Sequence, residues 1–446
     1  MPDDLTPSTV ELLQTLIRNR CVNDGTLASG NEIRSADVIE SFLGTTGLDI
    51  ERFDAAPGRT SVVARIDGTD PTAPSLCLMG HTDVVAANPD DWSQDPFGGE
   101  VIDGEVWGRG AVDMLNLTSS MAVAFRHLAT SGFRPRGDLI FFAVADEEAG
   151  SSVGARWMAE HHREAISADY VLTENGGLHS GPAEATFVSV NVAEKGVAWR
   201  RLRVRGESGH GSMPFKSSNA LVTAAAIIHR LAEYRPAPRF HELWRERVDT
   251  LGIDSDTAEL LMDPDRIDEV LTGMPLLGAA RNLHACTHTT VSPNAISGVM
   301  KTNVIPDVID VEVDIRTMPG ETTAEVDEHL RAALGDLYDR VEVEVILDDA
   351  ASISSTSTPL WDSLERAVTA SFPSSRLTPQ FTVGFTDARI YREMGSVAYG
   401  AGLFDPQLDA GEYGRMFHGR NERVGVESLR LTTQLWLDVV YDLLAP

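Results

Sequence analysis

Apolar runs alternate with helix-like patterns along the first part of the chain. Between about residue 35 and residue 175, runs such as TSVVARI and DLIFFAVA have the length and composition of buried strands. They are separated by NLTSSMAVAFRHLA and SVGARWMAEHH, in which apolar residues recur with helical spacing. This alternation predicts an α/β fold with a mostly parallel sheet, in which ligands bind beyond the carboxyl ends of the strands.

The pattern changes near residue 196. The alternating run VAWRRLRVRG is followed by helix-like SNALVTAAAIIHRLAEY, strand-like THTTVSPNAIS and VIDVEVDIR, a helix-like segment at 323–336, and VEVEVIL. This βαββαβ order predicts a ferredoxin-like α+β lid inserted into the α/β domain. We therefore expect an α/β domain at 1–196 and 351–446 and a lid domain at 197–350 that contains a further insertion at 232–287.

Composition narrows the classes of partner. The 67 Asp and Glu residues outweigh the 37 Lys and Arg residues and give a net charge of -30, which disfavours binding to nucleic acid or to an anionic membrane. No apolar run reaches the length of a transmembrane helix, and the acidic N-terminal stretch lacks the basic start of a signal peptide. Three widely spaced cysteines predict neither a disulfide framework nor a thiolate metal site and favour a cytoplasmic location.

Chemically active side chains follow several of the expected strands. The stretch LMGHTD ends one strand with His81 and Asp83, which face the same side of a strand because side chains alternate. A hydrogen-bonded turn histidine explains this pair alone more simply than a metal site does. Four further stretches of this kind are WGRGAVDM, ADEEAGS, LTENGG and FHGRNE, and they contain Asp113, Glu147, Glu148, Glu174 and His418.

The residue types in these stretches favour a particular chemistry. Two imidazoles and several carboxylates without a thiolate suit two zinc ions, with Co²⁺ or Mn²⁺ as substitutes. The side chains of adjacent Glu147 and Glu148 diverge, so one can bind metal while the other transfers protons. His284 and His288 could also face one side of an element in the insertion, although ordinary solvated or core histidines are more common than ligands.

These five motifs, in this order and over nearly the whole chain, resemble those of the dinuclear zinc amidohydrolases and metallopeptidases. That family includes aminoacylase, glutamate carboxypeptidase, acetylornithine deacetylase and succinyl-diaminopimelate desuccinylase. The resemblance implies that His81 binds one metal, His418 binds the other, and Asp113 bridges both. It further implies that Glu148 and Glu174 are the terminal ligands, one per metal.

The resemblance also implies a mechanism. A metal-bridged hydroxide attacks the amide carbonyl, and Glu147 acts as the general base and then as the general acid. Asp83 would lie behind His81 and fix its tautomer. Family members often have a cis peptide after the bridging aspartate, here between Asp113 and Met114. Many relatives continue Met-Lys-Gly, whereas this chain continues Met-Leu-Asn, which weakens assignment to any one subfamily.

Two lid motifs resemble substrate-contacting segments of the same family, and the late-chain motif VGFTDARIYREMG resembles the segment before the last metal ligand. His210 in GESGHGSMP matches a histidine that donates a hydrogen bond to the oxyanion, and in dimeric members it comes from the partner chain. Asn303 and Arg316 in KTNVIPDVIDVEVDIRTMPG match an asparagine and an arginine that contact substrate. Arg389 in VGFTDARIYREMG is suited to binding a free carboxylate through two hydrogen bonds, and a structural ion pair is nearly as well supported.

We therefore expect a dizinc exopeptidase, dipeptidase or N-acyl amino acid deacylase that acts on a small substrate with a free carboxylate. The lid is the expected surface for a homodimer, although the insertion at 232–287 could cap that surface. One alternative is a catalytically inactive binding or scaffold protein that retains the fold. A serine hydrolase is another, but GESGH lacks the last glycine of a nucleophile elbow.

Overall fold

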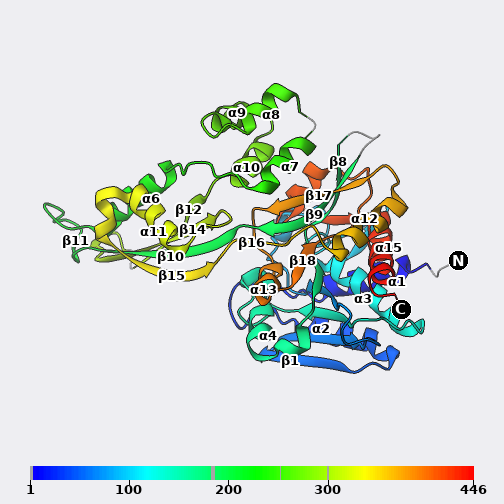
Figure 1. Cartoon of the computed structure of the whole chain (residues 1–446). Coiled ribbons are helices and arrows are strands. Elements are labelled where there is room, and N and C mark those ends of the chain that lie inside the picture. The colour runs from blue at the N-terminus through cyan, green and yellow to red at the C-terminus, as the bar shows by residue number, and fades with distance from the viewer. Residues whose placement is uncertain (1–3, 182–185, 252, 299–300, 446) are drawn as a thin grey trace.

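The computed structural model describes residues 4–181, 186–251, 253–298 and 301–445. Its largest sheet has ten strands in the order β1-β2-β6-β3-β7-β18-β9-β16, and β8 and β17 also pair with β9. Neighbouring strands in the middle of the sheet run parallel, which confirms the expected fold class; Figure 1 shows the whole chain. These central strands are β6 (Leu139–Val144), β3 (Leu76–His81), β7 (Tyr170–Thr173) and β18 (Val397–Gly400).

The two margins of this sheet contain antiparallel pairs. At one margin, β1 pairs with β2 and β2 with β6. At the other, β9 pairs antiparallel with β8, β16 and β18 and parallel with β17. The marginal strands are β1 (Ile50–Ala56), β2 (Arg59–Ile66), β8 (Gly176–Ser180), β9 (Phe187–Glu194), β16 (Ser352–Ile353) and β17 (Arg376–Thr382).

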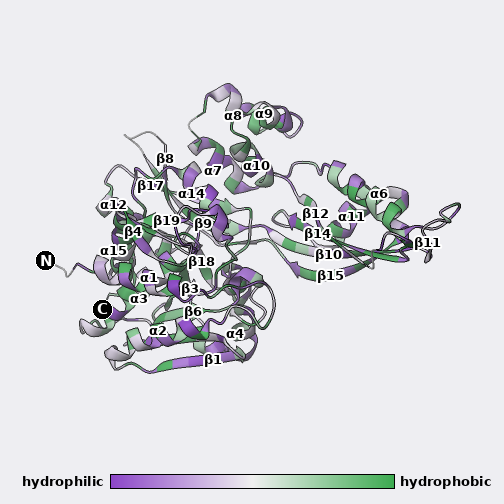
Figure 2. Ribbon diagram, turned by 180° about the vertical axis from the view of Figure 1, so that it is seen from behind, coloured by the Kyte–Doolittle hydropathy of each residue, from purple (hydrophilic) through white to green (hydrophobic). Residues whose placement is uncertain are grey.

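Helices cover both faces of the sheet. Residues of β3 alternate between two hydrophobic clusters: Leu76 and Leu78 join one, and Cys77 and Met79 join the other. Burial on both faces explains why this strand is continuously apolar, whereas the outer strand β1 mixes charged with apolar residues and is only partly buried (Figure 2). The covering helices include α1 (Thr6–Arg18), α2 (Ile33–Leu43), α3 (Leu115–Thr130), α4 (Ala155–His161), α5 (Arg163–Ile166), α12 (Pro359–Ser371), α13 (Ala388–Met394) and α15 (Val426–Leu443).

The lid is a separate antiparallel sheet in the order β12-β14-β10-β15. Helices α6 (Ala220–Glu233) and α11 (Thr323–Leu334) share a hydrophobic cluster with one face of it. Arginine–carboxylate pairs such as Arg201–Glu312 and Arg203–Asp310 lie on strand positions that alternate with this cluster. The strands are β10 (Gly196–Arg205), β12 (Thr290–Gly298), β14 (Val308–Thr317) and β15 (Val341–Asp349), and their order is the expected ferredoxin-like plan.

The insertion contains four short helices and packs against the α/β domain. Trp244 is fully buried and belongs to the same hydrophobic cluster as strand residues of the large sheet. Its indole Nε1 donates a hydrogen bond to the carbonyl oxygen of Leu261 at 3.0 Å. Of these helices, α7 packs against β17, and α8 and α9 lie farther out at the top of Figure 1. The four helices are α7 (Glu242–Thr250), α8 (Ser255–Leu261), α9 (Ile267–Gly273) and α10 (Leu277–Ala285).

The remaining short elements complete the site and the lid. Strands β4 (Glu100–Ile102), β5 (Glu105–Trp107) and β19 (Arg423–Gly425) form a small sheet, and α14 (Ala410–Met416) precedes His418. Strands β11 (Gly209–His210) and β13 (Val304–Ile305) pair at the tip of the lid (Figure 1). Among the described ranges, no helix is both long and apolar enough to cross a membrane.

Candidate metal centre

Parallel strands deliver four acidic or imidazole side chains to one edge of the sheet. His81 is the last residue of β3, and Glu174 directly follows β7. Glu147 and Glu148 lie in a 3₁₀ turn just beyond β6. Because β3, β6 and β7 run in the same direction, their carboxyl ends meet at this edge.

These residues form two groups of potential metal ligands that share Asp113. One group is His81, Asp113 and Glu174, and the other is Asp113, Glu148 and His418. His81 Nε2 lies 3.2 Å from Asp113 Oδ1, whereas His418 Nε2 lies 3.3 Å from Asp113 Oδ2 and 3.1 Å from Glu148 Oε2. Each oxygen of the Asp113 carboxylate therefore faces a different imidazole.

The Asp83 backbone fixes the tautomer of His81. His81 Nδ1 lies 2.9 Å from the carbonyl oxygen of Asp83, which can only accept a hydrogen bond, so Nδ1 carries the proton and Nε2 keeps its lone pair. The Asp83 carboxylate lies farther away, with Oδ1 at 3.5 Å from Nδ1. Its oxygens accept hydrogen bonds from the backbone N–H groups of Glu147 and Glu148. Asp83 thus connects the His81 ring to the turn that carries both glutamates.

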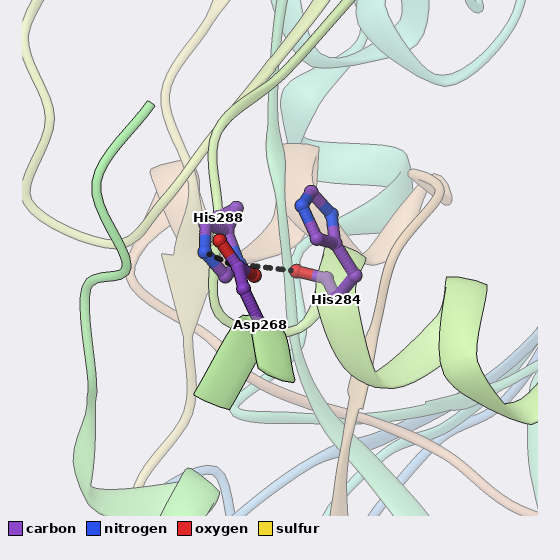
Figure 3. A group of neighbouring side chains, drawn as sticks. All are labelled: Asp268, His284 and His288. Atoms are coloured by element: carbon purple, nitrogen blue, oxygen red, sulfur yellow. Dashed lines mark hydrogen bonds and ion pairs between the residues drawn. The ribbon is translucent and has the colours of Figure 1, made fainter. Parts of the chain in front are cut away.

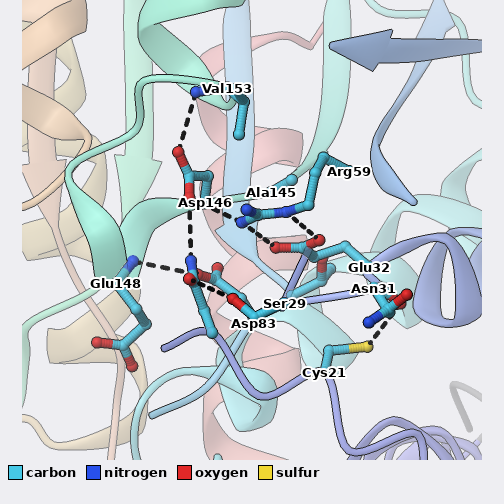
Figure 4. A network of polar contacts seen from close by, with 12 residues as sticks. Cys21, Ser29, Asn31, Glu32, Arg59, Asp83, Ala145, Asp146, Glu148 and Val153 are labelled. Atoms are coloured by element: carbon cyan, nitrogen blue, oxygen red, sulfur yellow. Dashed lines mark hydrogen bonds and ion pairs between the residues drawn. The ribbon is translucent and has the colours of Figure 1, made fainter. Parts of the chain in front are cut away.

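A buried polar network lies behind Asp83 (Figure 4). The Asn23 amide donates to Asp83 Oδ2 at 2.9 Å and to Asp146 Oδ1 at 3.0 Å. Arg59 donates two hydrogen bonds to Glu32, at 2.8 and 2.7 Å, and one to Asp146 at 2.7 Å. Sequence analysis did not identify this network as part of the site. Asp146 is the one member of the network that the sequence could have indicated, because it lies inside the motif ADEE.

The backbone around Asp113 is held by Glu422. Glu422 Oε1 accepts hydrogen bonds from the backbone N–H groups of Gly110, Val112 and Asp113, and its other oxygen pairs with Arg109 at 2.7 Å. Burial raises the pKa of Glu422 to about 7. The peptide bond from Asp113 to Met114 is cis, as expected from the family resemblance. Glu422 also lies in a recognised motif, FHGRNE, in which only His418 was assigned a role.

The electrostatics of the cluster are those of a cation site. Burial, together with neighbouring carboxylates, raises the pKa of Glu148 and raises those of Glu147 and Glu174 further. Hydrogen bonds to Asp113 and Glu148 raise the pKa of His418 to about 10. Glu148 Oε1 is buried and has no hydrogen-bond partner among the described residues. Divalent cations would neutralise this concentration of negative charge and give that oxygen a partner.

The structure separates the four expected substrate and oxyanion residues into two places. His210 and Asn303 lie together at the tip of the lid, away from the large sheet in both views (Figures 1 and 2), where the N–H of Gly211 donates to the carbonyl oxygen of Asn303. Arg316 lies near the other end of β14, with its guanidinium carbon 5.0 Å from the centre of the Phe385 ring. Arg389 packs against the same ring at 4.4 Å.

Arg389 and Arg316 differ in their free hydrogen-bonding capacity. Arg389 is buried, and its three nitrogens donate to Asp349, Thr386, Gly150 and Ser151. This favours the structural ion pair over carboxylate binding for Arg389. Arg316 pairs with Asp314 through Nε and Nη2, while its buried Nη1 has no partner among the described residues. Arg316 is therefore the better placed of the two to bind a further anion.

The sequence matches a known family over most of its length. Residues 77–442 match the model for peptidase family M20/M25/M40. The chain belongs to this family. The match confirms the resemblance inferred from the motifs, together with the expected class of metal-dependent hydrolase of peptide or amide bonds.

The relatives of the chain include proteins named for cleaving peptide bonds and proteins named for cleaving the amide bond of N-acyl amino acids. It is 25% identical over 395 residues to a probable carboxypeptidase S-like 2 of Dictyostelium discoideum, covering 85% of this chain and 74% of the relative. It is 26% identical over 397 residues to the N-fatty-acyl-amino acid synthase/hydrolase PM20D1 of Xenopus tropicalis, covering 86% and 75%. The fold matches an M20 metallo-carboxypeptidase of Sulfolobus solfataricus with a TM-score of 0.72, 16% identity and 98% coverage of each chain.

Proposed function

We propose that this M20 chain hydrolyses the amide or peptide bond of a small substrate that has a free carboxylate, and that it does so with two zinc ions. The observation that carries the proposal is the pair of three-residue groups joined by Asp113, with Glu147 beside them. His81, Asp113 and Glu174 would hold one ion. Asp113, Glu148 and His418 would hold the other. Two imidazoles and carboxylate oxygens suit zinc, and Co²⁺ or Mn²⁺ would serve as substitutes.

Glu147 is the residue proposed to move protons. Its side chain is buried beside the ligands but belongs to neither three-residue group. Two bound divalent ions would supply a water of lowered pKa and an electrophile for the carbonyl oxygen. Glu147 would accept a proton from the attacking water and return it to the leaving nitrogen.

The lid residues are proposed to bind the substrate. Arg316, whose Nη1 has no partner within the described part of the chain, is assigned to the free carboxylate. His210 and Asn303 are assigned to the same substrate but lie at the tip of the lid, which supports their contribution from a partner chain. The lid offers an edge strand for such pairing, since β12 is at the end of its sheet and exposes Ile296. We accordingly propose a homodimer formed through the lid.

We propose a cellular compartment from the state of the three cysteines. Cys21, Cys77 and Cys286 are all buried free thiols. Burial raises the pKa of each thiol, to about 11 for Cys21 and to about 12 for Cys77, which makes them poor nucleophiles. Three unoxidised cysteines support the expected cytoplasmic location.

A substrate panel tests this function. Dipeptides, N-acetyl amino acids, N-succinyl amino acids and N-fatty-acyl amino acids would be assayed with zinc, each beside the same compound with its carboxylate amidated. We expect turnover of at least one class, loss of turnover on amidation, and loss with a chelator followed by recovery with zinc, cobalt or manganese. Turnover that survives complete metal removal would contradict the proposal. A fully loaded enzyme that is inactive on every class would favour the scaffold alternative.

A further inference from the structure

A second group of metal-ligand types lies in the helical insertion, outside the site described above. Asp268 is in the first turn of α9, His284 is in the last turn of α10, and His288 follows four residues later. One donor atom from each residue lies within 4.8 Å of the other two. Figure 3 shows the three side chains gathered between α9 and the end of α10.

His288 has the hydrogen bonding of a histidine that is ready to bind a metal. It is fully buried, and its Nδ1 lies 3.1 Å from the carbonyl oxygen of His284. Nδ1 also lies 2.9 Å from the Thr287 hydroxyl oxygen, and that hydroxyl donates its own proton to the carbonyl oxygen of Leu283 at 3.1 Å. Both neighbours of Nδ1 therefore accept, so Nδ1 carries the proton and the lone pair is on Nε2. Nε2 lies 3.4 Å from Asp268 Oδ1 and is a buried atom without a hydrogen-bond partner among the described residues. A buried polar atom of this kind needs a partner.

His284 can supply the second nitrogen after a side-chain rotation. Its ring is stacked on the His288 ring, with centroids 4.0 Å apart and planes 6° from parallel. A metal lies in the plane of the imidazole that binds it, so His284 must turn about its Cβ–Cγ bond. The ring is half-buried and its nitrogens make no hydrogen bond with described residues, so rotation breaks no such bond. Burial lowers the pKa of His284 to about 4, which leaves its ring neutral at pH 7.

We propose that Asp268, His284 and His288 form a third metal site, which takes a divalent ion of the zinc class such as Zn²⁺, Co²⁺ or Ni²⁺. Two imidazole nitrogens and one carboxylate oxygen suit these ions, and water would complete the coordination. The Asp268 side chain is 60% exposed, so an ion can enter from solvent. The proposal does not depend on the activity of the catalytic centre.

The position of this site indicates a structural role. It joins α9 to the segment between α10 and β12, where the chain enters the lid. Lys195, at the crossing from β9 to β10, donates to the carbonyl oxygens of Ala285, the last residue of α10, and of His288 in that segment. A bound ion would therefore hold α9 against the place where the two connections into the lid, from β9 to β10 and from α10 to β12, contact each other.

Counting bound metal tests the proposal. Full-length protein would be dialysed to equilibrium against buffered zinc, and the zinc per chain would be measured for the wild type, Asp268→Asn and His284→Gln. Each variant should hold one ion fewer than the wild type. It should also show a smaller rise in thermal midpoint on adding zinc, because only bound metal stabilises the folded state. The control is His229→Gln, since His229 is 70% exposed on α6 and outside the group.

The measured quantity is the difference in zinc per chain between the wild type and each variant, so it does not depend on how many ions the catalytic centre holds. Equal zinc content in the wild type and both variants would overturn the proposal. The same loss in His229→Gln would also overturn it, because that loss would show unspecific binding to surface histidines. Circular dichroism of the metal-free proteins should be unchanged, since Asp268 is exposed and His284 is only half-buried.

Discussion

Individual residues of the candidate metal centre are positioned by partners behind them. The Asp83 carboxylate accepts hydrogen bonds from the backbone N–H groups of Glu147 and Glu148. The Glu422 carboxylate accepts three backbone hydrogen bonds, one of them from the N–H group of Asp113. Both carboxylates are fully buried, where hydrogen bonds to a charged acceptor are strongest. The ligand geometry therefore depends on residues that need not touch a metal themselves.

Glu147→Gln tests the division of labour at this scale. Glutamine cannot accept the proton, so we expect kcat to fall by about 10²- to 10⁴-fold. Metal content should be unchanged, because Glu147 belongs to neither ligand group. The matched control is Glu148→Gln, which should lower metal content as well as activity. If Glu147→Gln keeps the kcat of the wild type, Glu147 does not transfer the proton.

Arg59→Met tests the buried network. The change leaves Glu32 and Asp146 without their guanidinium partner, and such a loss costs about 3–5 kcal/mol. We expect a clearly lower denaturant midpoint in chemical unfolding. Arg65→Met is the control, because Arg65 pairs with Asp138 where both side chains are partly exposed, a contact worth about 0–1 kcal/mol. Equal midpoints for the two variants would show that the network contributes little.

The crossing between the two sheets is the critical feature at the scale of elements. Strand β9 belongs to the large sheet and β10 to the lid, with Lys195 alone between them. Burial lowers the pKa of Lys195 to about 7, while its ammonium group donates to two carbonyl oxygens of the insertion. A single buried amine thus connects the large sheet, the lid and the helical insertion.

This lysine gives stability a predictable pH dependence. In the unfolded chain its pKa is about 10.4, so between pH 7 and that value the unfolded state holds more protons. The Lys195 contribution to stability therefore rises with pH across this window, by at most about 1.4 kcal/mol per pH unit. The thermal midpoint of the wild type minus that of Lys195→Met should therefore increase as the pH increases from 7 to 10. A difference that stays constant with pH would exclude an unusual Lys195 pKa.

At the scale of the whole molecule, the lid tip is separated from the candidate metal centre. The half of β14 near Arg316 approaches the large domain, whereas His210 and Asn303 are at the opposite end of the lid (Figure 1). His210 is exposed there and its Nδ1 lies 2.7 Å from the Ser212 hydroxyl oxygen. If the tip contributes to catalysis, it does so most directly in a second copy of the chain.

Subunit mixing tests this arrangement. His210→Ala and Glu147→Ala chains should each be nearly inactive, but a hybrid dimer contains one site with an intact Glu147 and an intact His210. Random reassociation of equal amounts makes half the dimers hybrid, so about a quarter of wild-type activity should return. Each variant dissociated and reassociated alone serves as the control. No recovery in a sample that contains hybrid dimers would place the action of His210 within its own chain or outside catalysis.

Local sequence patterns predicted the secondary structure and brought several of the candidate metal ligands together. Strand and helix periodicity located β3, β6, β7 and the lid elements, because burial on one or both faces leaves a regular apolar pattern. His81, Glu147, Glu148 and Glu174 could be grouped because the carboxyl ends of parallel strands meet at one edge.

Only the tertiary structure decided which distant side chains meet. Glu32, Arg59 and Asp146 are far apart in the chain, and no periodicity predicts their hydrogen bonds. Likewise, the burial of Arg389, the packing of the insertion on the α/β domain and the grouping of Asp268 with His284 and His288 depend on how elements dock. Docking is set by complementary surfaces from remote segments, so it leaves no local pattern in the sequence.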